Sequence, residues 1–156
     1  MAFRLRADAE KWFSEVDGKD PVKTKFDLYY FCLLAGFASG RYADTARQDI
    51  STREIVQDFT LDYRPFARLL IGLLLVSELT RSGIDLTERK AVRAVLKQLV
   101  HPSGTGLSDV GFRAMNAYAS GGYEFLAESR EQKPGSPEEF LQDFSDLIGE
   151  AYSRKQ

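Results

Sequence analysis

The chain has few of the residues that commonly build disulfides, metal sites and nucleophilic active sites. Its 156 residues include one cysteine, Cys32, and one histidine, His101. A single cysteine cannot form an internal disulfide, and one residue of each type cannot supply the Cys/His ligand set of a structural zinc site. The apolar neighbours of Cys32 predict a small buried side chain. His101 precedes Pro102 at a predicted helix end, where contact with unpaired carbonyls is a simpler role than general-base catalysis.

Long apolar runs are also missing. The run at residues 69–76, with Gly72 included, spans eight residues, which is well short of the ~20 that a bilayer crossing requires. Residues 1–6 lack the continuous apolar stretch of a secretory signal. With a lone cysteine suited to a reducing compartment, these absences predict a cytoplasmic protein without a membrane partner.

The chain has no large excess of either sign of charge, and its formal net charge is −2. Such a balance excludes whole-molecule attraction to nucleic acid or to anionic lipid. Locally the charges separate: residues 80–115 hold six basic and three acidic residues, whereas residues 124–156 hold four basic and eight acidic ones. Any binding to phosphates or to an acidic protein would therefore depend on one basic region.

The composition, 44% hydrophobic and 28% charged, is typical of one globular domain over residues 1–156. No segment shows the period-two alternation of a half-buried strand. Residues 65–81 open on Pro65, stay apolar on every side from Leu69 to Val76, and meet a left-handed stop at Gly83. The prediction is an all-α fold with six or seven helices around a buried central helix at about residues 65–81.

Capping patterns predict where several other helices begin. Residues 7–16 read as a first helix, and residues 41–50 as a long connecting loop. The pair Gly121-Gly122 either kinks or ends the helix that contains it. Nearby small residues could admit another helix, within the monomer or from a second subunit. The expected capping residues are Thr24, Ser51, Thr87 or Asp85, Ser108, and Ser136 followed by Pro137.

The strongest candidate site is a basic helix face within the region 80–115. Lys90, Arg93 and Lys97 follow i, i+3, i+7 spacing, and Arg89 lies beside them. Cations on one face suit nucleic-acid phosphates, which they bind in a salt-dependent way without reading sequence. The alternative is an ordinary solvated helix face. Further candidates to extend the surface are Arg113 and Arg41.

Aromatic and acidic residues offer weaker candidates. Tyr118, Tyr123 and Phe125 could stack on bases, although packing in the core is the simpler interpretation. Glu78 follows an apolar run and needs a cationic partner, for which Arg81 and Arg68 are the candidates. Carboxylates four residues apart, Asp58 and Asp62, could hold a divalent cation or take part in acid–base chemistry, but a solvated face is the simpler interpretation. No catalytic residue, cofactor or metal ligand is predicted.

The start of the chain resembles a known family. Phe3-Arg4-Leu5-Arg6, followed by the helix pattern of residues 25–37 with Phe26, Asp27 and Gly36, is similar to small accessory proteins of bacterial DNA phosphorothioation (Dnd-type) defence clusters. The resemblance covers about the first forty residues and includes no catalytic residue. It implies a helical accessory subunit that associates with DNA or helps to assemble a complex.

Three hypotheses follow. The first is a non-enzymatic accessory subunit of a bacterial DNA-modification or phage-defence assembly that contacts nucleic-acid backbone, DNA rather than RNA, through the basic face. The second is a protein–protein adaptor or self-assembling scaffold whose basic face meets an acidic surface. In a homo-oligomer that surface would be the acidic tail of a neighbouring copy, around Glu138, Glu139, Asp143 and Asp146. The third is a small enzyme that uses carboxylates and a metal.

Overall fold

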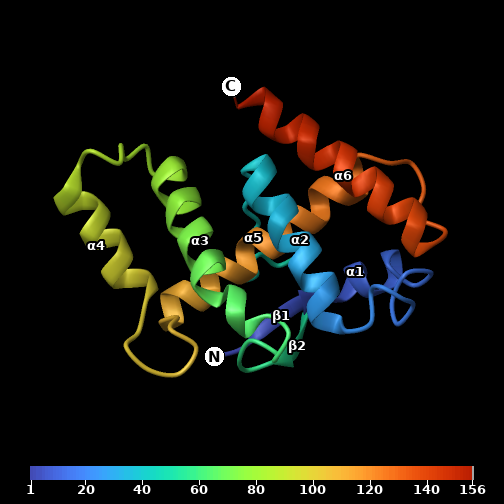
Figure 1. Cartoon of the computed structure of the whole chain (residues 1–156), viewed down its shortest axis with the longest axis horizontal. Helices are drawn as coiled ribbons and strands as arrows, with labels where there is room; N and C mark the ends of the chain where they lie inside the picture. Colours follow the sequence, from blue (N-terminus) through green and yellow to red (C-terminus); the bar gives the residue numbers. More distant parts are fainter. Residues whose placement is uncertain (156) are drawn as a thin grey trace.

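A crossed pair of helices forms the centre of the computed structural model, which describes residues 1–155. These helices are α2 (Lys25–Ser39) and α5 (Asp109–Glu128), and Figure 1 shows the other elements arranged around them. Every residue of α5 from Ala114 to Tyr123 is buried. The hydrophobic core therefore lies along α5, and the remaining helices cover it from several sides.

Local capping explains where α2 and α5 begin. Thr24 and Asp27 form the predicted capping box, in which the Thr24 hydroxyl accepts from the backbone N–H of Asp27 and the Asp27 carboxylate accepts from that of Thr24. Helix α2 ends at Gly40, whose φ of 74° is readily available only to glycine. The predicted cap of α5 is confirmed, because Ser108 accepts from the backbone N–H of Gly111 at 3.0 Å.

Glycines allow the two central helices to touch backbone to backbone. A Cβ added at Gly122 would lie 1.7 Å from the Cys32 carbonyl oxygen, and one at Gly36 would lie 2.0 Å from that of Tyr118. Helix α5 is continuous through Gly121-Gly122, so the helix does not end there and the predicted break is wrong. Both glycines lie against backbone atoms of the same chain. This contact agrees with packing inside the monomer, which is one of the two alternatives for the small residues.

The all-α prediction is wrong, because the chain also contains a two-stranded antiparallel sheet. Strand β1 (Phe3–Arg6) pairs with β2 (Thr52–Val56), with Leu5 opposite Arg53. The fold is mixed α/β, although mostly helical. Residues 51–54 match a capping box in type and spacing, but the pairing with β1 makes residues 52–56 a strand. The partner strand β1 lies about fifty positions away, so the sequence around residues 51–56 gives no sign of this pairing.

The predicted central helix is peripheral. A 3₁₀ turn, η1 (Arg64–Phe66), leads into α3 (Ala67–Arg81), of which only Leu70, Leu74 and Leu79 are buried. Leu69 is 61% exposed. An apolar run reveals that a helix avoids water, but not which of its faces the fold covers. The stop at Gly83 is confirmed by its φ of 69°.

Three further helices complete the fold. They are α1 (Ala7–Trp12), α4 (Arg89–Leu99) and α6 (Pro137–Arg154). Ser136 caps α6 as predicted, whereas α4 begins after Glu88 without a side-chain cap. The first helix ends sooner than predicted, and residues 41–50 form the predicted loop. None of the helices in residues 1–155 combines the length and apolar character that a bilayer crossing requires.

An aromatic cluster and one buried amide connect the short sheet to the two central helices. The Phe3 ring lies 4.8–5.4 Å, centroid to centroid, from four other rings. Asn116 of α5 accepts hydrogen bonds from the Arg4 backbone and the Tyr29 hydroxyl, and it donates to the Ala2 carbonyl. The four rings around Phe3 are Phe26, Tyr29, Phe59 and Phe112.

Candidate nucleic-acid interface

Helix α4 separates apolar from basic side chains around its axis. Leu99 is buried, and Val92 and Val95 are half-buried on the side that packs against α3 and α5. The four cations predicted from the sequence all lie on α4 and are all exposed. At about 100° per residue they fall within an arc of roughly 100° that faces away from the apolar side. These four residues, Arg89, Lys90, Arg93 and Lys97, form the α4 basic face.

The α4 basic face carries uncompensated positive charge. In the described part of the chain, none of its four cations lies within ion-pair distance of a carboxylate. The acidic residues just before α4 have other partners. Glu88 accepts from the Asp85 backbone, and Asp85 accepts from the backbone N–H and hydroxyl of Thr87. These hydrogen bonds lower the pKa of Asp85 and keep it ionised.

The position of α4 makes its basic face accessible. Figure 1 shows α4 at one end of the molecule, beside α3 and far from α1 and the start of α6. It packs through its apolar side against α3 and α5. The α4 basic face is therefore open to a partner as large as a nucleic-acid strand.

Arg113 and Arg41 lie outside this surface and have partners of their own. Arg113 donates to Asp44 at 2.8 Å, and Arg41 donates to both oxygens of Glu128 at 2.8 and 3.0 Å. The hydrogen bond from Arg113 lowers the pKa of Asp44, and that from Arg41 lowers the pKa of Glu128. The structure thus brings together four of the six predicted cations and uses the other two to hold the loop 41–50 against α5.

Glu124 is the centre of an ion-pair network that sequence reasoning missed. Its carboxylate accepts from Arg6 and from Arg47, both at 2.7 Å, and lies 3.7 Å from Arg41. Arg6 is buried and also donates two hydrogen bonds to Asp8. The partners of Glu124 are 118 and 77 residues away in sequence, so no local pattern could have identified them.

The predicted ion pair of Glu78 with Arg81 is confirmed. Arg81 donates to both carboxylate oxygens of Glu78, at 2.9 and 3.0 Å, and its guanidinium lies 4.0 Å from the centre of the Tyr42 ring. The Tyr118 hydroxyl also donates to Glu78, at 2.8 Å. The pKa of Tyr118 is raised, mainly by burial and to a lesser extent by this hydrogen bond. Arg81 and Tyr118 together provide partners for the Glu78 carboxylate, which would otherwise be buried without any.

The predicted base-stacking surface is not formed. Tyr118 and Tyr123 are buried, and Phe125 is half-buried against the core. Asp58 and Asp62 lie in the segment between β2 and η1 rather than on one helix. Over residues 1–155, no three His, Cys, Asp or Glu side chains gather in a way that could hold a metal ion.

The two rare residues of the chain have simple surroundings. Cys32 is buried, as predicted, and burial raises the pKa of its thiol. His101 follows α4, where its Nδ1 lies 3.2 Å from the Ser103 backbone nitrogen.

Comparisons of the chain with protein-family models, with curated proteins and with solved structures found no match. The α4 basic face therefore remains the strongest functional feature.

Proposed function

We propose that the protein is a non-enzymatic accessory subunit that contacts nucleic-acid backbone through the α4 basic face. The observation that carries this proposal is the set of four exposed cations on α4, none of which pairs with a carboxylate of residues 1–155. Cations that pair within the protein, such as Arg113 with Asp44, have part of their charge neutralised. The cations of α4 keep theirs for a partner.

The dimensions of the surface suit a phosphate backbone. From Arg89 to Lys97 the helix rises about 12 Å, and one strand of duplex DNA places a phosphate every ~3.4 Å of helix axis. The helix is therefore long enough for its cations to reach more than one phosphate of a strand. No base-reading side chain accompanies them, so we expect binding without sequence preference and with a steep dependence on salt.

The resemblance to Dnd-type accessory proteins supports a DNA-modification or phage-defence assembly as the setting, with DNA rather than RNA as the nucleic acid. The segments that carry the resemblance become β1 and α2, which pack on each other and on α5. They belong to the core, and α4 is separate from them. In such an assembly the core would hold the subunit together while α4 remained free to contact DNA.

The test is equilibrium binding to labelled single- and double-stranded DNA and RNA of equal length across a salt series. Wild type should bind at low salt, and the double variant Arg93→Glu with Lys97→Glu should lose that binding. The matched control is Lys11→Glu with Lys23→Glu, which changes net charge equally at exposed positions away from α4. Equal affinity of both double variants would refute the proposal, provided that circular dichroism shows both to be folded.

One observation favours the adaptor as a second candidate. The exposed side of α6 carries Asp146 and Glu150, four residues apart like Arg93 and Lys97 on α4. Carboxylates on α6 of one copy could therefore face the cations of α4 on another, which is a head-to-tail contact. Of the predicted acidic residues, Asp143 instead pairs with Arg130. This candidate predicts a mass that increases with concentration at low salt and stays monomeric in the Arg93→Glu, Lys97→Glu variant.

A further inference from the structure

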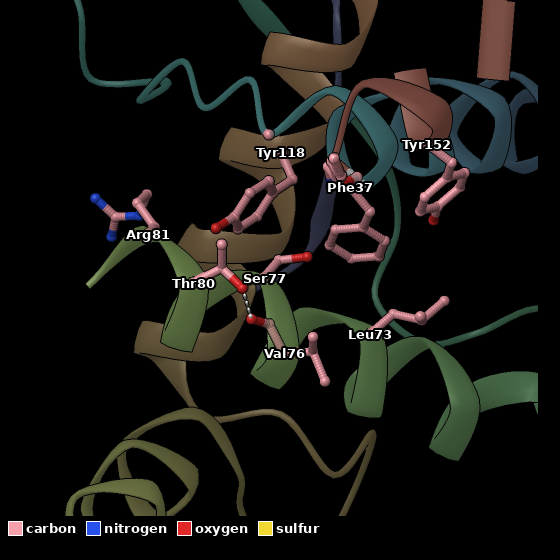
Figure 2. Close-up of a pocket in the computed structure, with 10 residues that line it drawn as sticks. Phe37, Leu73, Val76, Ser77, Thr80, Arg81, Tyr118 and Tyr152 are labelled. Carbon is pink, nitrogen blue, oxygen red and sulfur yellow. Dashed lines mark hydrogen bonds between the residues drawn. The ribbon is translucent and has the colours of Figure 1, made fainter. Parts of the chain in front are cut away.

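A groove separates α3 from the end of α6, and three of the residues that line it are aromatic. Its volume is about 190 Å³. Figure 2 shows Tyr118, Phe37 and Tyr152 in a row, facing Thr80, Val76 and Leu73 of α3 across the gap. The elements that supply these residues are the end of α2, the middle of α5, α3 and the last turns of α6.

Apolar side chains continue the groove along the outer side of α3. Leu69, Leu73, Val76 and Thr80 follow i, i+4, i+7, i+11 spacing, which places them on one face about 16 Å long. Thr80 contributes its methyl group, because its hydroxyl donates to the Val76 carbonyl. Leu69 is 61% exposed and Val76 49% exposed, while Tyr152 across the groove is 44% exposed. Exposed apolar side chains that form a contiguous strip commonly mark an interaction surface.

The charges beside the strip are positive. The Lys155 ammonium donates to the Phe37 carbonyl at 2.7 Å and has no carboxylate partner among residues 1–155. Arg68, next to Leu69 at the other end, likewise has none in this part of the chain. Arg81 is neutralised by Glu78. The lining residues from the described chain include no Asp or Glu, so a complementary partner carries carboxylates.

The size of the groove favours a polypeptide over a small molecule. Small-molecule pockets usually enclose about 300–1,000 Å³, more than this groove provides. A pocket of this size instead accepts one or two side chains, and the strip on α3 supplies further contact area beside it. An apolar strip about three turns long suits the docking of an amphipathic helix.

We propose that the groove between α3 and α6 binds an acidic amphipathic helix of a partner protein. Apolar side chains at i, i+4 and i+7 of that helix pack along Leu69, Leu73 and Val76, and one of them enters the pocket beside Tyr152. Its carboxylates face Lys155 and Arg68. This contact is separate from the α4 basic face and gives the protein a second surface, through which it joins other proteins.

The experiment selects 16-residue helical peptides from a displayed random library on the full chain, and measures the affinity of the best peptide by fluorescence anisotropy. We expect selected peptides to combine apolar residues at i, i+4 and i+7 with Asp or Glu. Val76→Glu should weaken binding by roughly tenfold or more, because hot-spot residues lie at the centre of such contacts. Val110→Glu is the matched control, because Val110 is 54% exposed at the start of α5, outside the lining.

A second variant tests the charge. Lys155→Gln keeps a donor for the Phe37 carbonyl but removes the positive charge, so it should weaken the acidic peptide several-fold. The same peptide with its acidic residues changed to Gln should not distinguish this variant from wild type. The Arg93→Glu, Lys97→Glu variant should bind the peptide normally, which separates this proposal from the function of α4. Failure to select any peptide, selection of basic peptides, or binding that is insensitive to Val76→Glu would each overturn the proposal.

Discussion

Gly122 of α5 lies against the Cys32 carbonyl of α2, so closely that an added Cβ would be 1.7 Å from the carbonyl oxygen. The contact is reciprocal, because Gly36 of α2 lies against the Tyr118 carbonyl of α5. Real Cβ atoms do not approach backbone oxygens so closely. The crossing of the two central helices therefore depends on glycine at both positions.

We expect Gly122→Ala to lower the free energy of unfolding by about 3 kcal/mol, because the helices must separate to admit a methyl group. The control is Gly72→Ala on α3, where nothing lies within 4 Å of an added Cβ. That change should instead stabilise the protein by about 0.5–1 kcal/mol, since alanine has the higher helix propensity. Urea denaturation of both variants measures the difference. Equal unfolding midpoints would contradict the close crossing.

Removing the Glu124 carboxylate should destabilise the protein. Its side chain is 17% exposed and accepts from Arg6, whose own side chain is 8% exposed. Glu124→Gln leaves this buried guanidinium with less compensating charge, although Asp8 remains beside it. Breaking such buried pairs is costly, and we expect a loss of about 2 kcal/mol in urea denaturation.

The matched control for Glu124 is Glu128→Gln, one helical turn along α5. Glu128 has a 62% exposed side chain and, among residues 1–155, pairs with Arg41 alone. Exposed pairs contribute less than about 1 kcal/mol, so this variant should unfold close to wild type. If the two substitutions cost the same, Glu124 is not the organising residue of the network.

Alkaline pH should unfold the protein through its buried phenols and thiol. Burial raises the pKa of Tyr123 to about 12 and raises the pKa values of Tyr29 and Cys32. The folded state therefore holds these protons more tightly than the unfolded chain. Stability from these groups is complete below the unfolded pKa values, about 8.5 for thiol and 10 for phenol, and is lost as pH rises towards the folded values.

The urea midpoint should accordingly stay constant from about pH 7 to 8 and fall progressively above about pH 9. Tyrosinate absorbance measured on the same samples should rise mainly when the protein unfolds, because burial raises the pKa values of Tyr29, Tyr118 and Tyr123. Ionisation of most tyrosines while the urea midpoint stays constant would show that these rings are solvated.

The features predicted correctly are those determined within a few residues. Thr24, Ser108 and Ser136 cap the helices that the sequence assigned to them, because each cap hydroxyl accepts from a backbone N–H only three positions away. The exposed arrangement of the α4 cations follows equally from helical periodicity. Spacing along one helix is sufficient for both.

The features predicted wrongly depend on residues far apart in the chain. Leu5 and Arg53 are paired in the sheet. Thr52–Val56 shows no strand alternation, and the alternation of Phe3–Arg6, which sequence reasoning missed, covers only four residues. Arg113 meets Asp44 across 69 positions, so local sequence does not reveal this ion pair and gives no reason to separate Arg113 from the α4 cations. The peripheral position of α3 has the same cause, since its apolar residues do not reveal that Leu69 faces solvent.

The salt dependence of DNA binding tests the role of the α4 basic face most directly. The measurement compares wild type with the neutral variant Arg93→Gln, Lys97→Gln on one labelled duplex, plotting the logarithm of the binding constant against that of salt concentration. Each lost phosphate contact reduces the slope by about 0.9, so the variant should have a slope about 1.8 smaller in magnitude. An unchanged slope, or no binding by wild type at low salt, would contradict the assignment of α4 as a backbone-contact surface.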